Sequence, residues 1–204
     1  MKEQFEKYMA ECPAVAILRG ITTAEVPAVC DALYEAGIRL LEIPLNSPDP
    51  INSIAAAVRH CAGRQLVGAG TVLTVEDVNA VYNAGGCFII SPNTDCDVIR
   101  ETKRLGMLSI PGFFTASEGF AATRAGADYL KLFPAILGPG YVKDLKAVIK
   151  TPIMAVGGVD AKSIPDFMKV CCGVGIGGAI YKAGKTAAEV KADAAEIVKA
   201  VKGA

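Results

Sequence analysis

One lysine, Lys131, stands within the apolar segment YLKLFP, whose other residues favour the interior of a protein. Burying an ammonium group without a partner is costly, so either the side chain extends to water or the amine gives up its charge. A lysine with its ordinary pKa of about 10.4 is almost fully protonated at neutral pH, whereas desolvation lowers that pKa by roughly 3 to 5 units. Lys131 is therefore either a strand-end lysine that reaches solvent or a nucleophilic amine.

A glutamate, Glu42, has the same setting in the segment LLEIPL. Side chains alternate between the two faces of a strand, so Glu42 shares a face with Leu40 and Pro44, as Lys131 does with Phe133. The side chains of Glu42 and Lys131 can thus point inward, while their neighbours Leu41 and Leu130 lie on the opposite face of the sheet. A nearby carboxylate stabilises the ammonium form of a lysine, yet it can also carry the protons that imine formation moves. The alternative for Glu42 is a solvated or structurally paired carboxylate.

Two glycine pairs lie in segments that could bind phosphate. Gly157 and Gly158 occur in VGGVDAKS, and Gly177 and Gly178 end the segment GVGIGG. Backbone N–H groups at helix N-termini attract anions, although such glycines can also serve only to permit tight turns. GVGIGG matches the dinucleotide pattern G-x-G-x-x-G, but only about 26 residues follow it. A βαβ unit with its acidic residue needs more chain, which argues against NAD.

Two polar residues follow other apolar segments. Arg19, in AILRGI, is either part of a salt bridge at the rim or a clamp for a substrate carboxylate, which a guanidinium group binds well. Thr71, in GAGTVL, is either a turn hydroxyl or a donor to the same carboxylate. Both residues become candidates for a site if the strands that precede them end at one edge of a sheet.

Eight short apolar runs recur along the chain at a spacing of about 20 to 26 residues. They are AVAIL (14–18), LLEIPL (40–45), LVGAG (66–70), FIIS (88–91), LSIP (108–111), YLKLFP (129–134), IMAVGG (153–158) and GVGIGG (173–178). Helical patterns separate most of them, and alternating strands and helices require a parallel sheet. Eight such units predict an α/β fold, a (β/α)8 TIM barrel, with a doubly wound open sheet as the alternative.

The organisation along the chain predicts one domain, residues 1–204, that begins with a short helix in MKEQFEKYMAEC. Thr74, Ser117 and Asp160 are the expected helix-start signals, and glycines follow several helices where they should end. Prolines at positions 44, 92, 111 and 134 fall at the carboxyl edges of the expected strands, where a missing N–H no longer weakens the sheet. In this barrel, chemistry collects at that edge.

Composition excludes several classes of function. Lysine plus arginine equals aspartate plus glutamate at 21 each, so no basic excess indicates nucleic acid or a membrane surface as a partner. Hydrophobic residues make up 52% of the chain, but no run reaches the roughly 18 residues of a membrane span. The amino-terminal segment lacks the apolar core of a signal peptide, and the seven scattered cysteines favour a reduced, cytoplasmic protein. The single histidine, His60, argues against serine–histidine catalysis and histidine-rich metal sites.

The ordered segments AILRGI, EIPLNSP, VGAGTVL, SPN, LKLFP and AVGGV resemble the class I 2-keto-3-deoxy-6-phosphogluconate and 6-phosphogalactonate aldolases. The resemblance runs from Val15 to about Gly178. It implies a trimeric (β/α)8 barrel in which Lys131 forms the Schiff base and Glu42 is the general acid and base. The other positions that match the family are Arg19 and Thr71 for the pyruvate carboxylate, Phe133 beside the lysine, and Gly157 and Gly158 for the phosphate.

Several details resemble the galactonate type. Gluconate-type members tend to read LRT after the glutamate segment and TGG in the seventh strand, whereas this chain reads LNSP and AVGG, with its arginine in LRGI. Val156 stands where a threonine hydroxyl could sense the configuration at C4. Gly178, beside Gly177, stands where a serine is common in the family. The backbone amides are therefore expected to contribute more to the phosphate site.

These features predict reversible cleavage of 2-dehydro-3-deoxy-6-phosphogalactonate to pyruvate and D-glyceraldehyde 3-phosphate, without metal or cofactor. The 6-phosphogluconate epimer and 4-hydroxy-2-oxoglutarate are alternative substrates. Two other classes stay open: a sugar-phosphate isomerase or epimerase that forms no imine, and a non-catalytic phosphosugar-binding barrel in which Lys131 is a structural cation. Metal-dependent isomerases need several ligands at strand ends, and only Glu42 stands out there.

Overall fold

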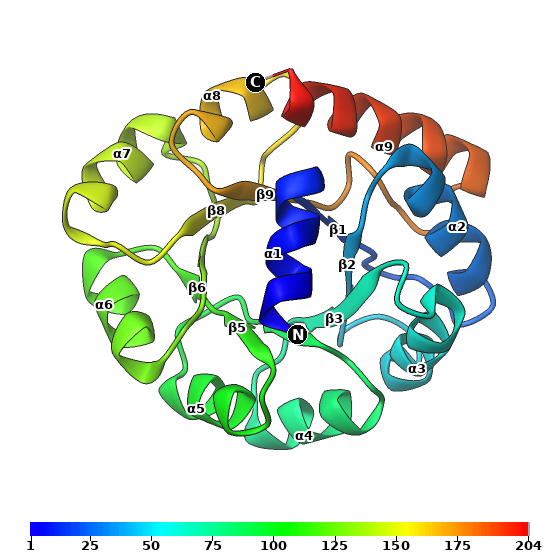
Figure 1. Ribbon diagram of the computed structural model, residues 1–204, viewed down its shortest axis with the longest axis horizontal. Coiled ribbons are helices and arrows are strands. Elements are labelled where there is room, and N and C mark those ends of the chain that lie inside the picture. The colour runs from blue at the N-terminus through cyan, green and yellow to red at the C-terminus, as the bar shows by residue number, and fades with distance from the viewer. Residues whose placement is uncertain (204) are drawn as a thin grey trace.

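The computed structural model describes residues 1–203 of the chain. Parallel strands form an inner ring and helices form an outer one (Figure 1). The strands are β1 (Ala14–Ile17), β2 (Leu40–Pro44), β3 (Leu66–Gly70), β4 (Phe88–Ile90), β5 (Leu108–Ile110), β6 (Gly112–Phe113), β7 (Leu130–Leu132), β8 (Ile153–Val156) and β9 (Gly173–Ile176). The helices are α1 (Lys2–Glu11), α2 (Val26–Ala36), α3 (Pro50–Cys61), α4 (Val75–Asn83), α5 (Cys96–Arg104), α6 (Ala116–Ala125), α7 (Gly138–Val148), α8 (Ile164–Met168) and α9 (Ala187–Lys202).

The ring closes at the segment that joins β5 to β6. β5 pairs with β4 and β6 pairs with β7, so these two short strands occupy one barrel position, interrupted at Pro111. Proline has no N–H to donate, but the Pro111 carbonyl accepts the Lys131 N–H at 2.9 Å, which continues the ladder. Residues 1–203 therefore form eight strand–helix units after α1. This arrangement confirms the (β/α)8 barrel and excludes the doubly wound open sheet.

Of the three expected helix-start signals, Thr74 is the N-cap of its helix and the other two are not. Thr74 caps α4, because its hydroxyl accepts the Asp77 N–H at 3.1 Å while the Asp77 carboxylate accepts the Thr74 N–H at 3.2 Å. The predicted start at Ser117 is wrong: Thr115, with a glutamate three residues later, forms the capping box of α6, and Ser117 lies inside the first turn. Asp160 is not the N-cap of α8, which is Ser163; the Asp160 carboxylate instead accepts two backbone N–H groups in the turn that precedes this helix.

The alternation of side chains along the strands produces two apolar layers. Leu41 and Leu130 belong to the larger layer, which lies between the strands and the outer helices. Leu40 and Tyr129 belong to a smaller cluster that fills the barrel interior. The two charged residues of these strands occupy inward-facing positions between such apolar neighbours, as the alternation predicts.

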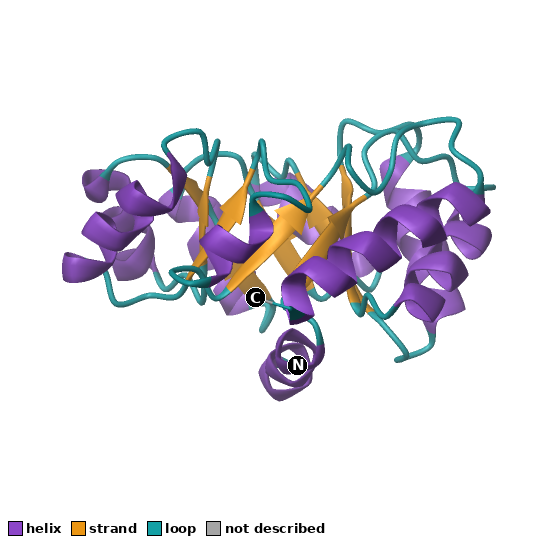
Figure 2. Cartoon of the chain, turned by 90° about the horizontal axis from the view of Figure 1, so that it is seen from above, coloured by secondary structure: helices purple, strands orange, loops and turns teal. Residues whose placement is uncertain are grey.

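Helix α1 closes the barrel at the end where the strands begin (Figures 1 and 2). Phe5, Tyr8 and Met9 of this helix are buried in the interior cluster. The Phe5 ring packs on Phe88 and Tyr129, with ring centroids 5.4 and 5.3 Å apart. Because this end is filled with apolar side chains, the opposite end of the barrel is the one available to a ligand.

Removing the Phe5 ring should therefore destabilise the protein. We expect Phe5→Ala to lower the free energy of unfolding by about 3 to 5 kcal/mol, since it leaves a cavity under the barrel. Urea unfolding of this variant beside Phe120→Ala, which changes a residue that is 38% exposed, measures the difference. A loss no greater than that of Phe120→Ala would mean that α1 is not part of the cooperative core.

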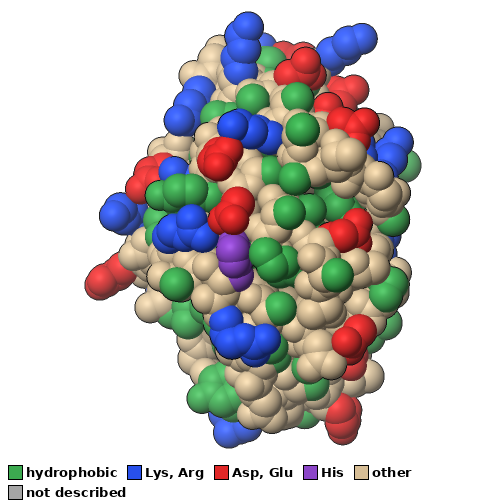
Figure 3. Space-filling view, turned by 90° about the vertical axis from the view of Figure 1, so that its right-hand side faces the viewer, with side chains coloured by type: hydrophobic (Ala, Val, Ile, Leu, Met, Phe, Trp, Pro, Cys, Tyr) green, Lys and Arg blue, Asp and Glu red, His purple; other side chains and the backbone are tan. Residues whose placement is uncertain are grey.

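The outer surface carries interspersed charges of both signs on the face shown in Figure 3. Asp31 accepts hydrogen bonds from Arg64 at 3.0 Å and pairs with His60 at 2.9 Å, and Lys191 pairs with Glu35 at 2.7 Å. Such exposed pairs contribute little to stability. No helix within residues 1–203 has the length and apolar character needed to cross a membrane.

Candidate active site

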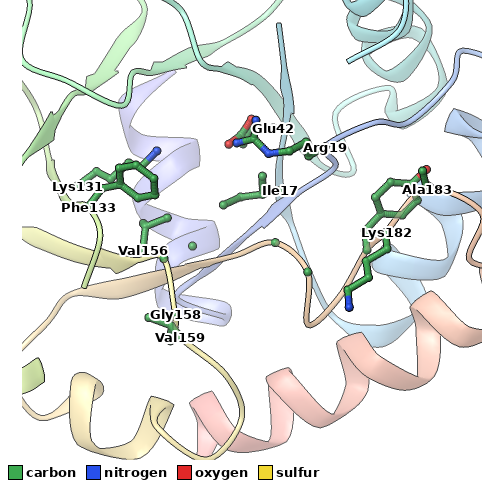
Figure 4. Close-up of a pocket in the computed structure, with 15 residues that line it drawn as sticks. Ile17, Arg19, Glu42, Lys131, Phe133, Val156, Gly158, Val159, Lys182 and Ala183 are labelled. Carbon is green, nitrogen blue, oxygen red and sulfur yellow. The ribbon is translucent and has the colours of Figure 1, made fainter. Parts of the chain in front are cut away.

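A cavity of about 400 Å³ lies at the carboxyl ends of the strands. Helix α1 covers the other end of the barrel (Figure 2). Every residue predicted for the site lines this cavity, except Thr71. The residues that line it are Ile17, Arg19, Glu42, Lys131, Phe133, Val156, Gly157, Gly158, Val159, Gly175, Gly177, Gly178, Tyr181, Lys182 and Ala183. Five strands, β1, β2, β7, β8 and β9, thus supply its walls (Figure 4).

Lys131 lies in the middle of β7 and points its amine across the cavity toward Glu42 and Arg19 (Figure 4). The residue is only 6% exposed, and its Nζ lies 4.5 Å from the centroid of the Phe133 ring. Burial lowers the pKa of the Lys131 amine; Glu42 opposes this effect and Arg19 adds to it. The side chain does not extend to bulk solvent, and its neutral form is favoured relative to an exposed lysine.

Glu42 is 2% exposed, and its Oε2 has no hydrogen-bond partner within residues 1–203. Burial raises the pKa of this carboxyl to about 7, against the opposing effects of Lys131 first and Arg19 second. Gly70 on the adjacent strand β3 leaves room for it: a β-carbon at Gly70 would lie 2.0 Å from Glu42 Oε2. A carboxyl group that titrates near neutral pH can both accept and donate a proton during a reaction.

A second, much smaller hollow of about 10 Å³ lies deeper in the barrel beside Lys131 and Glu42. The rest of its lining is apolar: Val15, Ile17, Ile90, Ile110, Met154, Val156 and Gly175. That volume is at the lower limit for one water molecule, and its walls offer few polar partners. Bulk water therefore approaches the two charged groups from the open end of the barrel.

Of the two residues predicted to bind the substrate carboxylate, Arg19 lines the cavity and Thr71 does not. Arg19 follows β1 at the rim, and its Nη1 donates to Asn46 Oδ1 at 2.7 Å, so the guanidinium group is oriented over the cavity wall. Thr71 follows Gly70 with a φ of 55°, in the left-handed region. It is half-buried and is not among the residues that line the cavity. The structure thus brings Arg19, but not Thr71, to the predicted site.

The two glycine pairs form adjacent parts of the cavity wall. Gly157 and Gly158 have φ values of 87° and 77°, and a β-carbon on Gly157 would lie 3.1 Å from the Phe133 ring. Gly177 and Gly178 begin a turn after β9. The N–H groups of all four glycines donate no hydrogen bond within residues 1–203. They are free to bind an anion.

Comparison with known proteins decides the family. A family model described as "KDPG and KHG aldolase" matches residues 5–200, which is nearly the whole described chain. The chain belongs to the KDPG and KHG aldolase family. It is therefore an aldolase, a carbon–carbon lyase.

Two relatives and one solved structure are especially similar to this aldolase. The 2-dehydro-3-deoxy-6-phosphogalactonate aldolase of Escherichia coli strain K12 is 42% identical over 97% of this chain and 98% of its own. A Rhizobium meliloti protein named "Probable 2-dehydro-3-deoxy-6-phosphogalactonate aldolase" is 43% identical over 89% of this chain and 87% of its own. A structure described as "Native KDPGal structure" superposes with a TM-score of 0.91, at 42% identity over 94% of this chain and 95% of its own.

Several lining residues of this aldolase were not predicted from the sequence: Ile17, Val159, Gly175, Tyr181, Lys182 and Ala183. Strand alternation could have identified Ile17 and Gly175, because each lies two positions before a predicted site residue. Tyr181, Lys182 and Ala183 lie in the irregular segment after β9, where no periodic pattern indicates which side chains face the cavity.

The space that Gly70 leaves for the Glu42 carboxyl gives a testable prediction for this aldolase. We expect Gly70→Ala to lower kcat about 100-fold, because the new methyl group displaces the carboxyl by roughly an ångström or more. Pyruvate release measured beside Gly140→Ala provides the control, since a β-carbon at Gly140 meets nothing within 4 Å. A kcat for Gly70→Ala equal to that of Gly140→Ala would show that the position of Glu42 does not limit turnover.

Proposed function

We propose that this protein is a class I aldolase that reversibly cleaves 2-dehydro-3-deoxy-6-phosphogalactonate to pyruvate and D-glyceraldehyde 3-phosphate. The observation that carries the proposal is the buried Lys131 amine, which shares one cavity with the buried, unpartnered carboxyl of Glu42. The two galactonate-type relatives, at 42% and 43% identity, support the substrate. The valine at position 156, in place of a hydroxyl, agrees with that choice.

The first stage of the proposed reaction joins the enzyme to the substrate. The neutral amine of Lys131 attacks the C2 ketone and forms a carbon–nitrogen bond, giving a carbinolamine. The former ketone oxygen then takes up protons and leaves as water, and an iminium ion remains. Glu42 lines the same cavity as Lys131 and can carry those protons, because burial raises its pKa to about 7, where both protonation states are accessible.

The second stage breaks the bond between C3 and C4. The carboxylate of Glu42, directly or through a water, removes the proton of the C4 hydroxyl group, whose oxygen becomes the aldehyde of glyceraldehyde 3-phosphate. The electron pair of the broken bond moves into the iminium ion, so an enamine forms instead of an unstabilised carbanion. Glu42 returns the proton to C3, and water then hydrolyses the pyruvyl iminium to free pyruvate and the Lys131 amine.

The two anionic ends of the substrate would position the bond that breaks. We assign the carboxylate to Arg19, whose guanidinium group lies at the rim, with Thr71 as a weaker candidate because it does not line the cavity. The free N–H groups of the two glycine pairs are assigned to the distal phosphate. Holding both ends fixes C2 against the amine and makes the attack effectively unimolecular.

The choice of substrate is tested by the two epimers at C4. Pyruvate release, followed with lactate dehydrogenase and NADH, should give a kcat/KM for the 6-phosphogalactonate compound at least about 10-fold above that for the 6-phosphogluconate compound. A preference for the gluconate compound would reassign the substrate while leaving the lysine chemistry in place. No pyruvate from either compound would reject the aldolase reaction as proposed.

We propose that the protein works as a homotrimer in the cytoplasm. We also propose that residues 1–204 of each chain form one domain. Support for an interface comes from Ile136 and Leu137, which expose 71% and 53% of their surface after β7. All seven cysteines are free thiols, as expected in a reducing compartment. Light scattering behind size-exclusion chromatography should give the mass of three chains, and the mass of one chain would contradict the trimer.

A further inference from the structure

The cavity has one cation that the steps above do not use. Lys182 is an exposed residue of the cavity wall, in the segment after β9. Within residues 1–203 its ammonium group has no ion-pair or hydrogen-bond partner, whereas nearby Lys185 pairs with Asp193 and Arg19 donates to Asn46. An unpaired cation at the wall of a binding cavity is available to an anionic ligand.

Lys182 lies against the second glycine pair. A β-carbon on Gly178 would lie 3.4 Å from Lys182 Cε, so the lysine stem occupies the space beside this glycine. The N–H groups of Gly177 and Gly178 are free in the same turn. The two backbone N–H donors and the Lys182 side chain therefore lie close together. Backbone N–H groups combined with a positive charge are well suited to bind a phosphate group.

The position of Lys182 separates it from the reacting end of the site. Figure 4 shows Lys182 and Lys131 on opposite sides of the cavity. The charges that shift the pKa of Glu42 are those of Lys131 and Arg19, and the charges that shift the pKa of Lys131 are those of Glu42 and Arg19. Lys182 therefore lies on the side of the cavity where the distal end of a substrate would bind, away from the Lys131 amine.

We propose that Lys182 binds the distal phosphate of the substrate and makes the enzyme prefer phosphorylated 2-keto acids to their unphosphorylated analogues. This inference rests on the proposed function. At Gly178 no side chain offers a hydroxyl group, so the ammonium of Lys182 supplies the contact beyond the backbone amides. Because the lysine is exposed, solvent screens its charge in the free enzyme, and its contribution comes from the contact made with the bound phosphate.

The test compares Lys182→Gln and Lys182→Arg with Lys143→Gln, which removes an exposed lysine that does not line the cavity. For the phosphorylated substrate, Lys182→Gln should lower kcat/KM roughly 10-fold, mostly through KM, because one charged contact is lost. For the unphosphorylated analogue of the same substrate, the kcat/KM of Lys182→Gln should stay within about twofold of the wild type, since this compound has no phosphate group for Lys182 to contact. Lys182→Arg should retain most of the activity, and Lys143→Gln should match the wild type.

A second measurement uses inorganic phosphate alone as the probe. Titration calorimetry should show weaker phosphate binding by Lys182→Gln than by the wild type and by Lys143→Gln. If the wild-type enzyme is active and Lys182→Gln keeps full activity, or loses activity equally on both substrates, the role of Lys182 is overturned. If the wild type cleaves neither substrate and forms no pyruvate adduct, the proposed function fails, while the phosphate titration still decides whether Lys182 binds the anion.

Discussion

Lys131→Met is expected to lower kcat for aldol cleavage by about 10⁴-fold or more, since Lys131 supplies the one buried amine among the described residues that line the cavity, whereas Lys182 is exposed. Methionine fills a similar volume and carries no charge, so the buried position should accept it without loss of stability. Lys131→Arg should be equally inactive, because a guanidinium group keeps its proton and cannot act as the nucleophile. Pyruvate release in a coupled assay measures the loss in both variants.

The matched control for this experiment is Lys143→Met, which removes an exposed lysine outside the cavity. It should retain the activity of the wild type. Thermal unfolding of all variants should show that Lys131→Met remains folded. Turnover by Lys131→Met within about 10-fold of the wild type would contradict the imine mechanism and favour a reaction, such as isomerisation, that needs no amine nucleophile.

Glu42→Gln is expected to lower kcat by roughly 10² to 10⁴-fold, the usual contribution of a general acid and base. Glutamine keeps the size of the side chain but cannot exchange the C4 hydroxyl proton. In the wild type, activity should fall as the pH decreases through about 7, because burial raises the pKa of Glu42 to about 7 and the cleavage step needs its carboxylate. The residual activity of Glu42→Gln should lack this acidic limb.

The same raised pKa predicts an effect on stability. The folded-state pKa of Glu42, about 7, lies above the ordinary value of 4.5, so the folded protein favours the protonated form. Stability from this group is fully present below pH 4.5 and is lost as the pH rises through 7. Glu42→Gln should therefore gain melting temperature over the wild type at pH 8 but not at pH 4. An equal difference at both pH values would show that burial does not perturb this carboxyl.

Much of the site could be predicted because strand geometry is regular. A period of two residues places Lys131 and Glu42 on the inner face of their strands, whatever the surrounding loops do. The parallel order of the strands then brings Arg19 and the two glycine pairs to the same end of the barrel. In the structure each of these residues lines the same cavity.

The remaining features depend on contacts between distant segments. Thr71 adopts a left-handed backbone conformation that its sequence does not indicate, and this residue is absent from the cavity wall. The need for glycine at position 70 arises only when β3 lies beside the Glu42 side chain. The interruption of a barrel strand at Pro111, and the position of Lys182 beside Gly178, likewise require the assembled barrel.

Borohydride trapping shows whether the buried amine of Lys131 forms a covalent imine. The enzyme is incubated with pyruvate, reduced with sodium borohydride, digested and mapped by mass spectrometry. We predict a reduced pyruvyl adduct on the peptide that contains Lys131 and none in Lys131→Met. Absence of any adduct while pyruvate demonstrably binds, or an adduct on another lysine, would mean that the reaction does not proceed through an imine on Lys131.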